Sequence, residues 1–322
     1  MIIFRKSNFK MKKHLCLLLI ASILCITSCG TPVKPSIDKI ILSENYQSEI
    51  FCKDASILAK PSGIACFGDR VVVSDYENCA LVVFDMDGNY LSTIGELGAA
   101  PLQFNTPGAM TVSGDTLYVL DMGNRRIQRL NSDLEYIDSI YLWEETQYFE
   151  FPYTDIAISE DETIYVSSGS LNPSKAGVYT VGNTYTHEYK TYYGFLDTYL
   201  GNIYFINTGE FTQNSGTTML NMSGKNFLYS FADGSQTMLP SALYSSDFLV
   251  TDDSLIVLAY DGSSIVRLDR CSGDYVETIV DFRQNADAQT EWSTNSYIAM
   301  DTEGNLYSTQ RNGGVVYKVS KK

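Results

Sequence analysis

Few side chains in this 322-residue sequence have the types and spacing that catalysis requires. The sequence contains two histidines, and the one outside the N-terminal segment is His187. A serine triad would need that histidine as its base, and no Gly-x-Ser-x-Gly elbow is present. His187 stands in Tyr185-Thr186-His187-Glu188-Tyr189, a β-type run that we expect to be the outermost strand of a sheet, away from any site.

Metal-ligand patterns are similarly weak. The segment Asp85-Met86-Asp87-Gly88-Asn89, with Glu96 at the twelfth place, superficially resembles an EF-hand loop. Its glycine stands at the fourth place instead of the sixth, and no helical pattern flanks it. The segment therefore predicts a hairpin turn. No local spacing identifies another set of ligands, and we expect neither a metal nor a cofactor.

The N-terminal segment carries the clearest chemical signal. A basic stretch ending at Lys12-Lys13 precedes an apolar run over residues 15–26, which is shorter than the roughly 20 residues of a spanning helix. The run ends in Ile26-Thr27-Ser28-Cys29-Gly30, which resembles the bacterial lipobox. This resemblance implies that the Cys29 thiol receives a diacylglyceryl group and that the chain is cut just before it. An ordinary secretory signal with an incidental cysteine is the alternative, and translation could start at Met1 or Met11.

These features predict three parts. Residues 1–28 are expected to be a lipoprotein signal peptide, residues 29–36 a lipidated tether, and residues 37–322 a folded domain. Two acyl chains, at about 0.8 kcal/mol per buried CH₂, hold a protein on a membrane without a spanning helix. We therefore expect the protein in the cell envelope, membrane-anchored on the extracytoplasmic side.

The charge distribution bears on partners. Five of the 23 basic residues lie in residues 1–28, which leaves 18 basic against 38 acidic residues and a net charge of −20. Such an acidic surface repels phosphate backbones, so we expect no nucleic-acid partner. The cysteines that follow Cys29 are Cys52, Cys66, Cys79 and Cys271. An exported protein can form disulfides, but four cysteines allow three pairings, and free buried thiols are equally compatible with the sequence.

An internal repeat predicts the fold. A turn followed by a short β-rich run recurs six times, and the first apolar positions of these runs are Val71, Leu117, Ile164, Ile203, Leu255 and Leu306. Their spacings of 46, 47, 39, 52 and 51 residues match the length of a four-stranded propeller blade with its loops. Small-residue strands precede several copies, as in residues 61–65 and 107–112, and suit a crowded axis. The sequence predicts an all-β, six-bladed β-propeller with four-stranded blades.

The N-terminal and C-terminal segments of the domain are expected to pair in one blade. The sixth copy ends after residues 315–319 and lacks a fourth strand, while residues 37–42 form an unassigned strand-like run. We expect this N-terminal run to complete the last blade, because ring closure removes exposed strand edges.

One copy resembles a known family. Residues 95–131 resemble an NHL repeat through Gly95, Gly98, Phe104, Pro107-Gly108 and the run from Leu117 to Ile127. The resemblance implies a propeller that serves mainly as a binding platform, although some members are enzymes. Asp121, Asn124, Arg125 and Arg126 could bind a ligand at a loop. The favoured interpretation is structural, because in such repeats this Asp and Arg tie adjacent blades together through charge-assisted hydrogen bonds.

Aromatic residues are the better indication of function. The two tryptophans, Trp143 and Trp292, fall between a fourth strand and the next first strand. Tyr148, Tyr76 and Arg311 are expected on the same face of the propeller. Aromatic rings with scattered polar groups suit an unknown protein, peptide or glycan ligand. We therefore expect a non-catalytic binding platform. The alternative is an envelope hydrolase or lactonase with a divalent cation held by Asp and Asn at the channel mouth.

Overall fold

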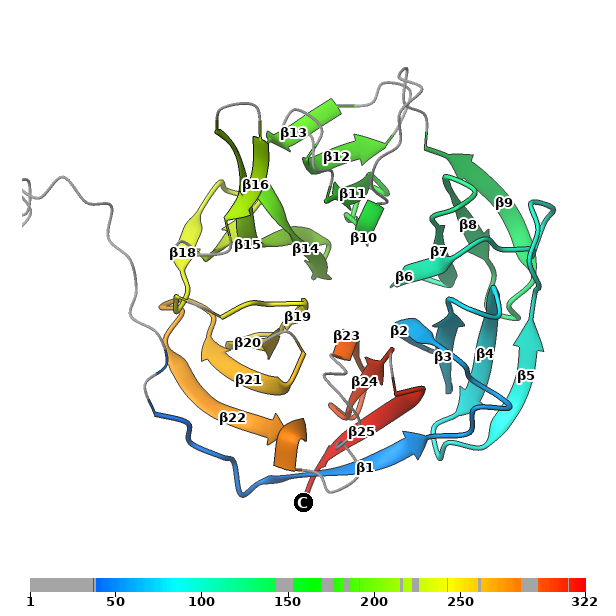
Figure 1. Cartoon of the computed structure of the whole chain (residues 1–322), viewed down its shortest axis with the longest axis horizontal. Coiled ribbons are helices and arrows are strands. Elements are labelled where there is room, and N and C mark those ends of the chain that lie inside the picture. The colour runs from blue at the N-terminus through cyan, green and yellow to red at the C-terminus, as the bar shows by residue number, and fades with distance from the viewer. Residues whose placement is uncertain are drawn as a thin grey trace, which may run out of the picture. The chain divides into compact units, whose positions relative to one another are not determined.

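Six antiparallel sheets surround one axis in the computed structural model (Figure 1). The structure describes residues 37, 39–142, 153–169, 176–181, 186–190, 192–214, 217–221, 226–241, 243–259, 262–284, 295–311 and 313–322. Each sheet is one blade of four strands, and blade four carries an additional fifth strand. The predicted all-β, six-bladed propeller is confirmed. No helix in these ranges is long and apolar enough to cross a membrane.

The strands follow the chain outward from the axis in each blade. Blade one contains β2 (Pro61–Phe67), β3 (Arg70–Asp75), β4 (Ala80–Asp85) and β5 (Tyr90–Ile94), and blade two contains β6 (Pro107–Ser113), β7 (Thr116–Asp121), β8 (Arg126–Leu130) and β9 (Tyr136–Tyr141). Blade three contains β10 (Tyr153–Ile158), β11 (Ile164–Ser168), β12 (Gly177–Val181) and β13 (Thr186–Lys190). Blade four contains β14 (Tyr192–Tyr199), β15 (Asn202–Asn214), β16 (Thr217–Asn221), β17 (Phe227–Ser230) and β18 (Gln236–Met238). Blade five contains β19 (Asp247–Val250), β20 (Ser254–Ala259), β21 (Ser264–Asp269) and β22 (Tyr275–Asp281), followed by a 3₁₀ turn, η1 (Phe282–Gln284). Blade six contains β23 (Asn295–Met300), β24 (Leu306–Gln310), β25 (Val315–Lys321) and, from the N-terminal side, β1 (Tyr46–Cys52).

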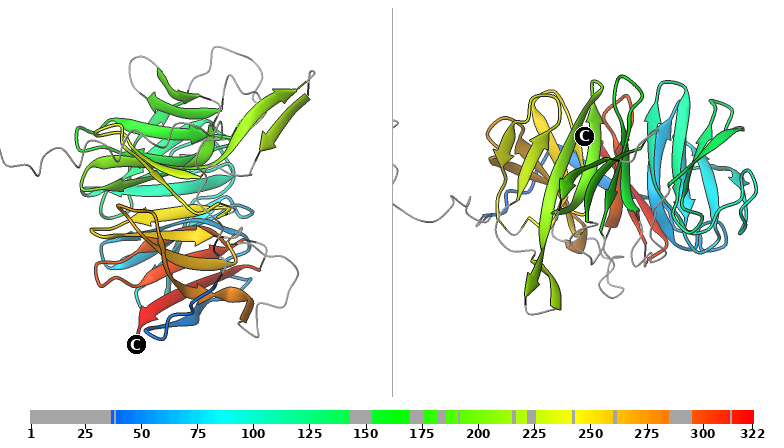
Figure 2. Two further views of the ribbon diagram at one scale, coloured as in Figure 1. Left: turned by 90° about the vertical axis from the view of Figure 1, so that its left-hand side faces the viewer. Right: turned by 90° about the horizontal axis from the view of Figure 1, so that it is seen from above.

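This order gives the propeller two different faces. The turns between first and second strands and between third and fourth strands lie on one face, which we call the turn face. The connections between second and third strands and between successive blades lie on the other, which we call the connection face. The long strand β15 pairs with β17 through its first half and with β16 through its second half. The resulting β15–β16 hairpin projects beyond the blades on the connection face (Figure 2).

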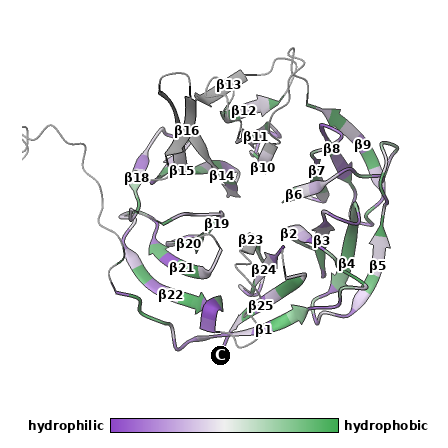
Figure 3. Ribbon diagram, in the orientation of Figure 1, coloured by the Kyte–Doolittle hydropathy of each residue, from purple (hydrophilic) through white to green (hydrophobic). Residues whose placement is uncertain are grey.

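The apolar core lies between the blades. Within the described residues there are six clusters of buried apolar side chains, and each fills the gap between two neighbouring blades. The central strands supply much of it, as the hydrophobic colouring of β4 shows (Figure 3). Small residues allow close approach at the axis: a Cβ added at Gly63 would lie 2.1 Å from the carbonyl oxygen of Gly108 in the next blade.

An N-terminal strand closes the ring, as predicted, but it is not the predicted segment. Strand β1 pairs antiparallel with β25, so residues 46–52 complete blade six, and residues 37–42 do not. The Phe51 ring packs against Phe84 of blade one and Tyr307 of blade six, with centroids 5.7 and 5.2 Å away. These contacts explain why residues 46–52 and not residues 37–42 form the closing strand, because residues 37–42 contain no aromatic side chain. Leu42 instead forms an isolated bridge to Thr278 on the outer strand of blade five.

We expect two short deletions to separate these segments. Removing residues 46–52 should lower the melting temperature strongly and promote aggregation, because it exposes the edge of β25 and removes the contacts of Phe51 with blades one and six. Removing residues 37–43 should change stability little. Thermal melts with light scattering would compare the two proteins. Equal melting temperatures would show that the ring does not depend on β1.

Candidate functional site

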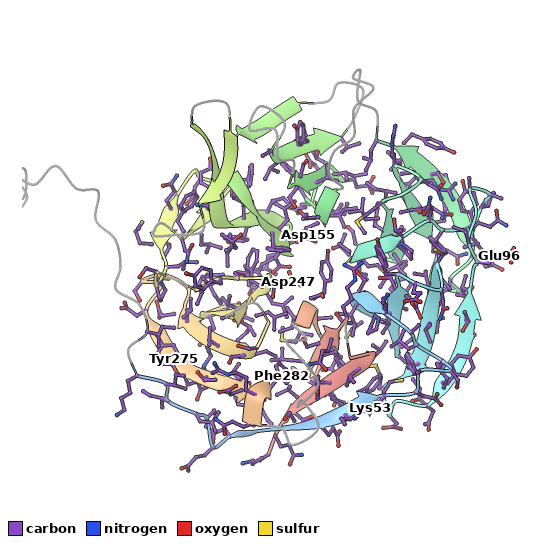
Figure 4. The ribbon with its side chains drawn as sticks, in the orientation of Figure 1. Lys53, Glu96, Asp155, Asp247, Tyr275 and Phe282 are labelled. Atoms are coloured by element: carbon purple, nitrogen blue, oxygen red, sulfur yellow. The ribbon has the colours of Figure 1, made fainter. Side chains whose placement is uncertain are left out.

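A cavity of about 150 Å³ lies on the axis, where the innermost strands of all six blades meet. Most of the residues that line it are apolar, but they include three carboxyl groups, Asp155 of β10, Asp197 of β14 and Asp247 of β19. Asp155 and Asp247 are near the centre of the ring in Figure 4. The residues that line the cavity include no lysine, arginine or histidine.

Each of these carboxyl groups caps the next blade. An oxygen of Asp155 accepts a hydrogen bond from the Leu196 amide of blade four at 2.8 Å. Asp197 accepts one from Val250 of blade five at 2.6 Å, and Asp247 accepts one from Ile298 of blade six at 2.8 Å. The innermost strand of a blade has one edge without a neighbouring strand, and its buried amides need acceptors. The three aspartates supply them.

Burial changes the acidity of these groups. It raises the pKa of Asp155 and of Asp197 to about 7. It also raises the pKa of Asp247 well above its ordinary value, and the neighbouring negative charge of Asp155 adds to the effect. Groups with such pKa values suit proton transfer. However, the second oxygens of Asp155 and Asp247 accept the amides of Ile156 and Phe248, both at 2.9 Å, so both groups serve the backbone.

A tyrosine forms a hydrogen bond across the axis. The Tyr297 hydroxyl of β23 donates a 2.6 Å hydrogen bond to the carbonyl oxygen of Thr154 in β10. Blades six and three are opposite one another in a six-membered ring, so this side chain crosses the axis. Thr154 precedes the cavity-lining residues of β10, so this hydrogen bond lies at the end of the cavity nearer the connection face.

The cysteines do not supply a nucleophile to this cavity. Cys52, Cys66, Cys79 and Cys271 are all free, so no disulfide forms among them. Only Cys66 lines the cavity, and burial raises the pKa of its thiol to about 12. Because the thiolate is the nucleophilic form, the Cys66 thiol is unreactive near neutral pH.

Two of the five residues expected on the connection face lie together. Tyr76 follows β3 and Arg311 follows β24, and the Arg311 guanidinium lies over the Tyr76 ring, 3.8 Å from its centroid. Both side chains are partly exposed. The contact joins blade six to blade one. Trp143, Tyr148 and Trp292 lie outside the described residues.

The motif that resembles an NHL repeat holds the chain between blades one and two. Asp121 and Arg126 form a buried ion pair at 2.8 Å, with side chains 0% and 2% exposed. Arg126 also donates to the carbonyl oxygens of Ala99, Ala100 and Gln103 in the connection from β5 to β6. Asn124 donates to Asp121 at 2.8 Å and to Gly98 at 2.7 Å, and Arg125 occupies the tight turn with φ of 54°. The expected structural role of this motif is confirmed.

Other sequence expectations can be placed as well. His187 lies on β13, the outermost strand of blade three, as predicted. Asp85 accepts the backbone amides of Asp87 and Asn89, so the loop resembling an EF-hand is a hairpin turn, as predicted. Within the described ranges, no group of three or more His, Cys, Asp or Glu side chains is placed to hold a metal ion.

The axial aspartates are the feature that sequence reasoning missed. Their signal is a charged residue within an apolar first strand, as at Asp155 beside Ile156 or Asp247 beside Phe248. That signal marks a buried carboxyl group, but it does not indicate which backbone amide the carboxyl group will meet.

Comparisons with known proteins agree on the fold. A family model described as a 6-bladed beta-propeller matches residues 52–239. No curated protein matches the chain. A structural genomics protein of unknown function from Bacteroides thetaiotaomicron has 15% identity and a TM-score of 0.60, over 86% of this chain and 76% of that one.

Two enzymes are also similar in structure. A gluconolactonase from Xanthomonas campestris has 14% identity and a TM-score of 0.59, over 92% of this chain and 99% of its own. Virginiamycin B lyase from Staphylococcus aureus has 12% identity and a TM-score of 0.56, over 85% and 98%. At such identities the likeness shows the fold alone.

The axial carboxyl groups should give stability an unusual pH dependence. A carboxyl group whose pKa is raised by folding stays protonated in the folded state while the unfolded chain ionises. Its stabilising contribution is therefore present below about pH 4 and is lost as the pH rises to about 7. Stability should therefore fall as the pH rises through this range.

The variant Asp247→Asn should flatten this decline, while its amide oxygen can still accept the Ile298 amide. Thermal melts between pH 5 and pH 8 would measure it. Asp138→Asn is the control, because the hydrogen bond from Arg129 lowers the pKa of Asp138 and so its contribution is lost only on acidification. Parallel curves for Asp247→Asn and the unmodified protein would refute the assignment.

Proposed function

The chain belongs to this family of six-bladed β-propellers, and from that premise we propose that it is a lipid-anchored, non-catalytic binding protein of the cell envelope. Its ligand is a protein, a peptide or a glycan, and it binds on the connection face. The observation that carries the proposal is the stacked pair of Arg311 and Tyr76 on that face. The pair presents a guanidinium and an aromatic ring together, which are groups enriched where proteins bind partners.

The chemistry of the axis supports binding over catalysis. The carboxyl groups of Asp155 and Asp247 are held by backbone amides, and the Tyr297 hydroxyl is held by Thr154. The Cys66 thiol has a pKa of about 12. The polar groups there already have partners that stabilise the ring. The lactonase alternative requires a set of metal ligands, and the described ranges contain no group of three or more His, Cys, Asp or Glu side chains placed to hold a metal ion.

The N-terminal sequence supports the anchor. An apolar run over residues 15–26 follows a basic stretch and leads to Cys29, in the arrangement that resembles a lipobox. Lipidation at Cys29 would place the membrane attachment eight residues before Ile37, where the described chain begins. The propeller would then stand on the extracytoplasmic side of a membrane.

The anchor leads to a direct prediction. Cys29→Ala should move the protein from the membrane fraction to the soluble fraction and abolish its labelling by a radioactive fatty acid, because the lipid is the proposed attachment. The melting temperature of the propeller should not change, since residues 29–36 precede it. An unlabelled mutant that stays in the membrane fraction would argue against lipid anchoring.

The binding face leads to a second prediction. Arg311→Ala and Tyr76→Ala should each weaken capture of the partner from envelope extracts by roughly 30-fold, corresponding to about 2 kcal/mol for an interface hot spot. Immobilised propeller and quantitative mass spectrometry would measure the retained proteins and glycans.

A matched pair on the turn face provides the control. There the Arg270 guanidinium lies over the Tyr199 ring, 5.4 Å from its centroid, again between neighbouring blades. Arg270→Ala should leave capture unchanged. If Arg270→Ala and Arg311→Ala reduce capture equally, the connection face is not the binding face.

A further inference from the structure

An apolar patch lies on the outer rim of blade five, beside the point where the chain enters the propeller. Ile40, Ile41 and Leu42 are 47%, 48% and 46% exposed, and Val276 on the adjoining strand β22 is 40% exposed. We propose that this rim patch lies on the lipid bilayer, so that the propeller is held edge-on to the membrane. The proposal rests on the lipid anchor at Cys29 inferred above.

The patch is held in place by the blade. The Thr278 amide donates to the Ile41 carbonyl oxygen at 2.7 Å, and the Ser43 amide donates to the Thr278 carbonyl oxygen at 2.8 Å. The Ile41 amide in turn donates to the Tyr275 hydroxyl at 2.8 Å. These bonds fix the backbone of the segment while its apolar side chains stay in contact with solvent. Three consecutive exposed branched side chains on a fixed backbone suit an apolar partner.

The anchor limits which surface can reach the membrane first. Cys29 and Ile37 are separated by eight residues, which span at most about 28 Å when fully extended. The rim patch begins three residues later and is the apolar surface nearest to the anchor along the chain. A tether this short gives the patch a high effective concentration at the bilayer surface.

Charge opposes membrane contact less at the patch than over most of the surface. The chain beyond residue 28 has a net charge of −20, which opposes contact with anionic headgroups over most of its surface. Near the patch, however, the exposed residues include Lys39 and the C-terminal Lys321 and Lys322. The Lys322 amide donates to the Asn45 carbonyl oxygen at 2.9 Å, which brings the C-terminal lysines to the entering chain (Figure 1). The acidic residues of the entering chain, residues 37–52, are Asp38, Glu44 and Glu49, so the charges there are balanced.

An edge-on position has a consequence for binding. With the outer rim on the bilayer, the propeller axis runs along the membrane plane, and both faces stay open to the surrounding space. The connection face can then reach a partner without being covered by lipid.

Ile137 provides a matched comparison. It lies on β9, the outer strand of blade two, and is 45% exposed. Blade two is opposite blade five in the ring, so Ile137 should be far from the bilayer in the proposed orientation. The two positions therefore share residue type, exposure and rim location but differ in their distance from the anchor.

The experiment uses the full-length lipidated protein in vesicles of phosphatidylethanolamine and phosphatidylglycerol. Cys271, the exposed free cysteine, is first replaced by serine. An environment-sensitive fluorophore is then attached at Ile41→Cys or at Ile137→Cys, and lipids carrying a nitroxide at headgroup depth serve as quenchers. We expect a blue shift and several-fold stronger quenching for the label at position 41.

The outcomes separate this inference from the anchor itself. Equal, weak quenching at both positions in vesicle-bound protein would overturn the rim contact and leave the lipid anchor standing. Protein that carries no acyl group and does not float with the vesicles would overturn the anchor, and with it the rim contact. Unchanged melting temperatures of the labelled proteins confirm that both remain folded.

Discussion

Each blade of this propeller can bury its two apolar faces only against its neighbours. The six buried clusters of the described residues lie between blades and none lies within a single sheet, so a blade alone has no core. The ring must therefore close, and β1 closes it by joining β25. Phe51 makes that closure specific by contacting side chains of both blade one and blade six.

Closure creates a second requirement at the axis, where each first strand has an unpaired edge in a crowded interior. In blades three to five, an aspartate on the first strand accepts a hydrogen bond from a backbone amide on the unpaired edge of the next blade. Blades one and two are in close backbone contact at Gly63 and Gly108. The Tyr297 hydroxyl of blade six donates a hydrogen bond across the axis to blade three. The polar groups of the axis are used in this way to hold the ring. The connection face, with its loops and the β15–β16 hairpin, is free of that requirement and is available for recognition (Figure 2).

The sequence predicts the architecture well because the same constraint acts on every blade and leaves a repeat of 39 to 52 residues. It also predicts the turn at Asp85, since those contacts are local, and the roles of Asp121 and Arg126, since residues 95–131 resemble a known repeat. It places the closing strand too early, because apolar character favours Ile37 to Leu42 while the deciding contact of Phe51 is with distant residues. It does not reveal the axial aspartates as caps for the same reason: Asp155 and its Leu196 partner are 41 residues apart. The placement of Trp143, Tyr148 and Trp292 on the connection face stays a prediction.

The central claim is that recognition takes place on the connection face of an extracytoplasmic propeller. Site-specific photo-crosslinking in living cells tests it most directly, with a photoreactive amino acid placed at the exposed Glu77, beside Tyr76 on the connection face, or at Leu200 on the turn face. Leu200 is 76% exposed and lies in the turn between β14 and β15, so it is at least as accessible to a partner. We expect a discrete crosslinked product from position 77 and none from position 200. A product from position 200 alone would contradict the claim.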